Sequence, residues 1–100
     1  MIATATCETF APHVGERFAA MTPSGMSFEL VLTSAEASRH GAPDGARRAP
    51  FSLLFHAEGE QRARPQQTFA LRHARLGAFE LFLVPLGPDE RGMRYEAVIG

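Results

Sequence analysis

The sequence predicts an all-β protein, a small antiparallel six-stranded meander that closes into a barrel or roll. Short runs of residues alternate between apolar and polar side chains, and clusters of Gly, Pro, Ser and Asp separate them at near-regular intervals. No connection carries the 3.6-residue apolar repeat of a helix that could cross between parallel strands. The chain has 100 residues, which suits one barrel-like domain over residues 1–100.

One short helical turn is expected before the first strand. Thr9 and Pro12 are typical of a helix start and Gly15 of its end, and Phe10 and Val14 would then share a face. Residues 22–25 form a turn between the first two runs, which predicts a hairpin. The strands are expected at residues 16–21, 26–32, 51–55, 67–73, 78–84 and 93–99.

The core is expected to be aromatic. Residues 78–84 are the most hydrophobic run, so we expect a central strand that is covered on both faces and ended by Pro85. Residues 34–50 lack large apolar side chains and predict the longest exposed loop. Tyr95 is expected to pack in the core with its hydroxyl bonded to backbone. The inward side chains would include Phe28, Phe51, Phe55, Phe69 and Phe79.

Charge and cysteine content exclude several classes of protein. Ten Arg residues, with no Lys, face eleven acidic residues for a net charge of −1, so we expect no nucleic-acid partner and no charge-driven membrane binding. The single Cys7 excludes an internal disulfide framework and a zinc ribbon. The start of the chain lacks the features of a signal peptide, and no apolar stretch has the length of a membrane span. A cytoplasmic location is therefore expected.

Candidate catalytic groups do not form a recognisable constellation. Four histidines are present, but none pair at metal-ligand spacing, so no metal and no cofactor are expected. His56 and His73 end successive predicted strands, which would place them at opposite edges as independent rim residues.

Two other arrangements of reactive side chains could carry chemistry, a thiol nucleophile and a carboxylate pair. Cys7 could act as a nucleophile with His13, although an unreactive thiol is the commoner case. Glu80 and Glu96 could form an acid and base pair, but ion pairs with Arg72 and Arg94 across the sheet are expected instead.

Several segments resemble an uncharacterised bacterial family of about 100 residues. They are Phe51–Phe55 (FSLLF), residues 81–89 (LFLVPLGPD) and residues 94–98 (RYEAV), and the opening from Thr9 to Phe18 is also similar. The resemblance covers nearly the whole chain and carries no activity or site residue. Some relatives are encoded near tail-fibre or collar-type proteins, which implies an accessory or assembly role.

The favoured function is a non-catalytic module for protein binding or self-association. Outward apolar residues on two strands exceed what so small a domain can cover, and two Arg-rich loops and two rim histidines add polar candidates. The alternative is a small-ligand binder or small enzyme that uses the barrel mouth. The candidate binding residues are Leu54, Phe82, Val84, Arg47, Arg48, Arg62, Arg64, His56 and His73.

Overall fold

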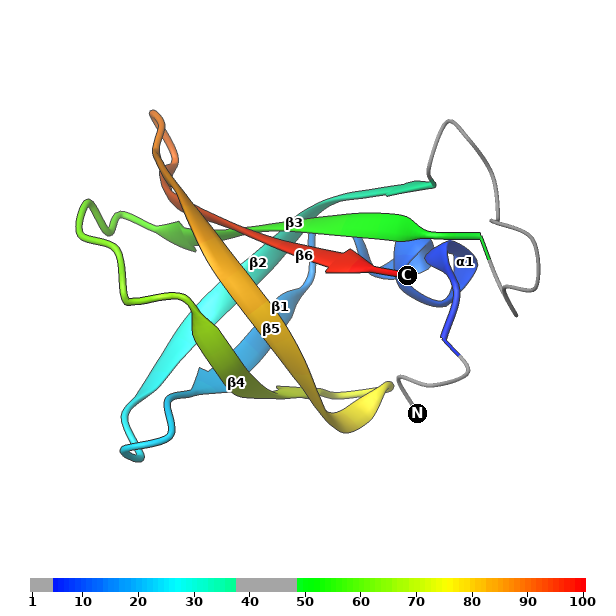
Figure 1. Ribbon diagram of the computed structural model, residues 1–100, viewed down its shortest axis with the longest axis horizontal. Coiled ribbons are helices and arrows are strands. Elements are labelled where there is room, and N and C mark those ends of the chain that lie inside the picture. Colours follow the sequence, from blue (N-terminus) through cyan, green and yellow to red (C-terminus); the bar gives the residue numbers. More distant parts are fainter. Residues whose placement is uncertain (1–4, 38–48) are drawn as a thin grey trace.

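Six antiparallel strands close into a barrel in the computed structural model, which describes residues 5–37 and 49–100 (Figure 1). The predicted all-β barrel with a short N-terminal helix is confirmed. Within the described residues, no helix has the length and hydrophobicity needed to span a membrane. The elements are α1 (Cys7–Phe10), the 3-10 helix η1 (Ala11–His13), β1 (Arg17–Met21), β2 (Ser27–Ala37), β3 (Phe51–Glu58), β4 (Gln67–His73), β5 (Gly77–Pro88) and β6 (Gly92–Ile99).

The strand order differs from that of a simple meander. Around the barrel it is β1-β2-β3-β6-β5-β4, so β3 pairs with β6, and β4 closes the barrel against β1. The chain therefore forms two consecutive three-stranded units, and residues 59–66 carry it across one end of the barrel from β3 to β4 (Figure 1). Such a polar connection is too long to force its flanking strands into a tight hairpin, which explains the departure from the expected order.

Three strands are longer than the sequence predicts. β2 continues to Ala37 through a register shift between Leu32 and Ser34, which leaves Thr33 as the extra residue of a β-bulge. β3 extends to Glu58. The expectation that Pro85 ends β5 is wrong, because the register shifts between Pro85 and Gly87 and the strand runs on to Pro88. A bulge tolerates a residue without an N–H donor.

The interior is filled by side chains. Phe51, Phe55, Phe69 and Phe79 are buried as expected, whereas Phe28 is only partly buried at one end. A barrel of this size leaves no open lumen, because inward side chains meet across it. The expectation that β5 is covered on both faces is wrong, since Phe82 on its outer face is 52% exposed.

The helix α1 plugs one end of the barrel. The Thr6 backbone N–H donates to Thr9 Oγ1 at 2.9 Å, which caps the helix start three residues before the expected Thr9. Phe10 is fully buried, and its ring lies 6.0 Å from that of Phe51 and 5.8 Å from that of Phe79. Val14 is 45% exposed, so the expected shared face of Phe10 and Val14 is wrong.

The β3–β4 connection covers the opposite end. The Arg64 backbone N–H donates to Tyr95 Oη at 2.9 Å, and the Arg64 guanidinium lies 3.7 Å from the centre of the Phe28 ring. Tyr95 is fully buried and bonded to backbone, as the sequence predicts. Glu60 forms an ion pair with Arg64 and so holds this cover in place.

Replacing the plug residue should destabilise the whole barrel. Phe10→Ala is expected to lower the free energy of unfolding by about 3–5 kcal/mol, because it leaves a cavity between Phe51 and Phe79. Val14→Ala, a control on the same segment, should change it by less than about 0.5 kcal/mol. Urea unfolding of the two variants measures both effects, and equal losses would contradict the role of Phe10 as a plug.

Candidate functional site

The predicted apolar binding residues face outward on β3 and β5, the two strands that flank β6 in the barrel. Leu54 of β3 and Val84 of β5 are half-buried, and each is the cross-strand partner of Glu96 on β6. Phe82, two residues before Val84 on β5, lies on the same outer face. Val98, two residues after Glu96 on β6, faces outward as well and is 72% exposed, although the sequence did not indicate it as a binding residue.

The four loop arginines are not equivalent. Arg62 is exposed on the β3–β4 connection, whereas Arg64 on the same connection is occupied as part of the barrel cover. Arg47 and Arg48 lie outside the described residues. The idea that the two Arg-rich loops meet at one anionic site therefore stays a prediction.

His56 lies in a chain of hydrogen bonds between β2, β3 and the β5–β6 turn. Its Nε2 is 2.8 Å from Asp89 Oδ2, and its Nδ1 is 3.0 Å from Thr33 Oγ1. The backbone N–H groups of Arg91 and Gly92 donate to Asp89 Oδ1 at 2.9 and 3.2 Å. The hydrogen bonds from His56 and then from the Arg91 backbone lower the pKa of Asp89 to about 2.

Connectivity alone makes this chain similar to a hydroxyl–imidazole–carboxylate triad. Thr33 is the bulge residue, and its hydroxyl also lies 3.1 Å from the Leu54 carbonyl, which it can bond as a donor. The hollow beside His56 is lined by His56, Asp89, Glu90 and Arg91, and it does not reach Thr33. A nucleophile needs access to a substrate and a group that stabilises the oxyanion, so these contacts favour a structural anchor for the β5–β6 turn.

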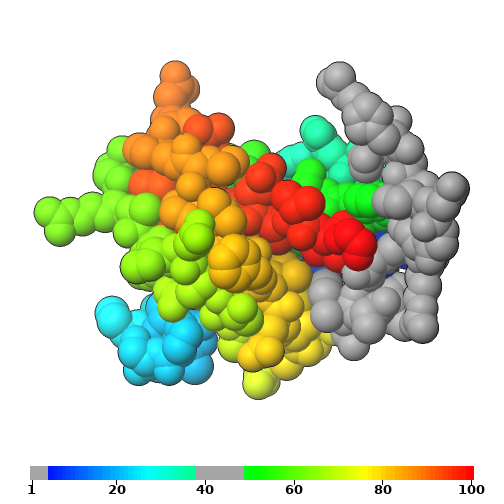
Figure 2. Space-filling model, viewed as in Figure 1, coloured from blue at the N-terminus to red at the C-terminus, as the bar shows by residue number. Residues whose placement is uncertain are grey.

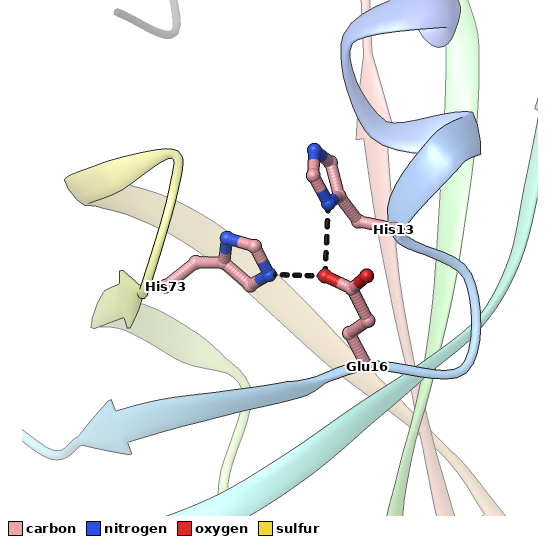
Figure 3. Close-up of side chains that lie close together, drawn as sticks. All are labelled: His13, Glu16 and His73. Carbon is pink, nitrogen blue, oxygen red and sulfur yellow. Dashed lines mark hydrogen bonds and ion pairs between the residues drawn. The ribbon is translucent and has the colours of Figure 1, made fainter.

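His73 belongs to a second cluster, with His13 and Glu16 (Figure 3). Glu16 Oε1 accepts from both rings, 2.8 Å from His13 Nδ1 and 2.7 Å from His73 Nε2. These two hydrogen bonds, that from His13 first, lower the pKa of Glu16. The cluster joins η1 to the start of β1 and the end of β4, and the His73 ring packs 4.5 Å from the Phe18 ring.

Two histidine nitrogens and a carboxylate oxygen within 4.8 Å of one another match the ligand set of many zinc and iron sites. The second nitrogen of His73 decides against that use. Its Nδ1 accepts the backbone N–H groups of Arg75 and Leu76, both at 3.1 Å, so this nitrogen holds a lone pair and Nε2 carries the proton. A metal ligand needs the reverse, with the remote N–H donated to an acceptor. The cluster is therefore a hydrogen-bonded anchor.

The other candidate groups remain apart. Glu80 pairs with Ala70 and Glu96 with Leu54 and Val84, so the two carboxylates do not form an acid and base pair. The expected ion pairs of these glutamates with Arg72 and Arg94 are also absent from the described part of the chain. Surface ion pairs form elsewhere, between Arg17 and Glu29 and between Arg91 and Glu58.

Cys7 begins α1 and is partly buried. Burial raises the pKa of its thiol, and the carboxylates of Glu8 and Glu36 raise it further. A thiol with a raised pKa is protonated near neutral pH and is a poor nucleophile.

The sequence did not indicate the acidic partners of the histidines. Glu16 stands three residues after His13, a spacing that local turns bring together. Asp89 follows Pro88 between two strands, where Asp is common for reasons of turn geometry alone. Thr33 carried no signal, because the apolar alternation of the predicted strand ends at Leu32 and polar residues follow.

Residues 5–99 match a protein family described as Domain of unknown function (DUF6916). The chain belongs to this family. The match confirms the resemblance to an uncharacterised family over nearly the whole DUF6916 chain. No curated protein and no solved structure gives a significant match.

Acid should weaken the Asp89 anchor in the DUF6916 barrel. The folded pKa of about 2 lies below the ordinary value of 3.8, so the anchor stabilises the fold above pH 3.8 and is lost as the pH falls through 2. Asp89→Asn should therefore be less stable than the wild type near neutral pH, with a difference that shrinks toward pH 2. Urea unfolding across this range measures it, with Glu90→Gln as the control. A constant difference would contradict the anchor.

His73 should stabilise the fold without any metal. His73→Ala is expected to cost about 1–3 kcal/mol of unfolding free energy, because it leaves two turn N–H groups without their acceptor and removes one of the two imidazoles bonded to Glu16. Added Zn²⁺ should leave the melting temperature of the wild type unchanged. A stoichiometric zinc complex that raises the melting temperature of the wild type, and not that of His73→Ala, would overturn the anchor interpretation.

Proposed function

We propose that this DUF6916 barrel is a non-catalytic module that binds a protein partner through its outer apolar patch, defined as Leu54, Phe82, Val84 and Val98. The observation that carries the proposal is that these four apolar side chains face outward on β3, β6 and β5, which are adjacent in the barrel. Phe82 is 52% and Val98 72% exposed. Apolar side chains that gather on one face of a domain mark interaction sites more often than scattered apolar residues do.

The patch follows from strand register. Leu54 and Val84 flank Glu96 in one row across β3, β6 and β5, and Phe82 and Val98 lie two residues further along β5 and β6. Because side chains alternate between faces, all four point away from the core. Figure 2 shows that β5 and β6, coloured gold to red, form a continuous surface across the middle of the face in view.

A partner for this patch would combine apolar and basic side chains. A hollow of about 250 Å³ beside the patch is lined by Glu36, Phe51, Ser52, Glu96 and Val98, together with Pro50. Glu36 and Glu96 form no ion pair within the described residues, and their two carboxylates give the lining of this hollow a negative charge. An apolar anchor with an adjacent Arg or Lys would satisfy both features.

The alternative, a small-ligand binder or small enzyme at the barrel mouth, is less well supported. Phe10 fills one end of the barrel, and Arg64 with Tyr95 covers the other. His56 and His73 are 5% exposed each and are bonded to carboxylates, so neither offers a free imidazole to a ligand.

We propose that the partner belongs to an assembly of the tail-fibre type and that binding takes place in the cytoplasm. The resemblance to proteins encoded near tail-fibre genes supports that choice. A compact module without chemistry of its own suits an accessory that docks on a larger component.

Val98→Asp should weaken partner binding, because a buried carboxylate would face an apolar anchor. Cross-linking followed by affinity capture from the native host would compare the wild type, Val98→Asp and the control Val14→Asp. We expect one partner with the first and third proteins, and a loss of about tenfold or more with the second. If the same proteins are captured by all three variants in the same amounts, the result contradicts the proposal.

A further inference from the structure

We propose that the chain forms a two-fold symmetric dimer through a second face of the barrel, the β1–β4–β5 groove. This surface is defined as the outward side chains of Ala19, Met21, Ala70, Arg72, Ala78 and Glu80. The inference goes beyond the proposed function, because the groove shares no residue with the outer apolar patch. It would stand if that patch bound nothing.

Small side chains make the groove. Ala19, Arg72 and Ala78 are cross-strand neighbours in one row, and Met21, Ala70 and Glu80 form the next row. With alanine at three of six outward positions, the sheet surface is hollowed to a volume of about 440 Å³. Met21 stands at the edge of this hollow and is 45% exposed. The surface therefore offers an apolar depression with an exposed apolar side chain at its edge.

The groove carries one positive side chain, Arg72, and one negative side chain, Glu80. Arg72 and Glu80 are both exposed, and neither forms an ion pair or side-chain hydrogen bond within the described part of the chain. They occupy diagonal positions on β4 and β5, a spacing that long side chains can bridge. Elsewhere on the barrel surface, exposed Arg and Glu side chains do pair, as Arg17 does with Glu29.

This arrangement is self-complementary. A two-fold axis that lies in the interface and crosses midway between Arg72 and Glu80 brings Arg72 of one copy onto Glu80 of the second copy, and the reverse pair forms at the same time. The same operation lays the alanine floor of one copy against the floor of the other. A single cation and a single anion beside an apolar floor thus select a second copy of this chain as the occupant.

Charge reversal tests the dimer without disturbing the fold, since both side chains are exposed. Sedimentation equilibrium of the wild type should show a monomer–dimer equilibrium. Arg72→Glu and Glu80→Arg should each weaken the dimer about tenfold or more, because each places like charges together twice. The matched controls are Arg75→Glu and Glu90→Arg, which make the same charge changes away from the groove and should leave the dimer unchanged.

Two rescues separate the specific pairing from a general charge effect. The double variant Arg72→Glu/Glu80→Arg should dimerise like the wild type, and an equal mixture of the two single variants should form a mixed dimer. A wild type that stays monomeric up to near-millimolar concentration would overturn the inference and leave the outer apolar patch untouched. A dimer that survives both single reversals would also overturn it.

Discussion

Closure of the sheet is the constraint on which the rest of the structure depends. Every strand has a hydrogen-bonded neighbour on each side, so the barrel presents no long unpaired edge to other chains. With only six strands, the inward side chains fill the interior completely. Closure therefore removes the two commonest binding devices of β proteins, an open edge and an open lumen. Among the described residues, the outward side chains of the strands and the connections between them are the surface that remains for a partner.

Closure also explains the polar architecture at the two ends. Strands that tilt around a narrow barrel leave turns and loops standing at its rims, and each rim is tied down by a buried histidine that meets a carboxylate. Asp89 holds the β5–β6 turn to His56, while Glu16 holds both η1 and the end of β4 through His13 and His73. A buried imidazole is stable there because both of its ring nitrogens have partners.

Much of the fold follows from local patterns in the chain. Period-two alternation placed the strands, and the aromatic residues at inward positions identified most of the core. The pattern could not show that β3 pairs with β6. The polar β3–β4 connection does not indicate which strand lies beside β3 in the barrel. The prediction that Pro85 ends its strand was wrong because a bulge accommodates the proline inside β5. The expected position of Val14 was wrong because the helical turn continues as the 3-10 helix Ala11–His13 and the backbone of Val14 is extended.

The candidate sites depend on information that no short pattern holds. The pairing of His73 with Glu16 joins residues from opposite halves of the chain, and the groove appears only when β1 lies beside β4. The outward position of Leu54, Phe82 and Val84 was predictable, since alternation fixes the face. What alternation cannot supply is the neighbour on the next strand. That pairing brings Ala19, Ala70 and Ala78 from three strands together into a hollow.

The division into two three-stranded units has a consequence for how the barrel folds. Each unit is built from neighbouring strands, so its internal contacts are local in the chain. The seams that join the units are distant, since Ala19 pairs with Arg72 and Phe51 with Ile99. Closing distant seams carries a large loss of chain entropy before contacts form, which raises the contact order and slows folding. We therefore expect the two seams to form last, with the exposed edges of β1, β3, β4 and β6 vulnerable to aggregation until they meet.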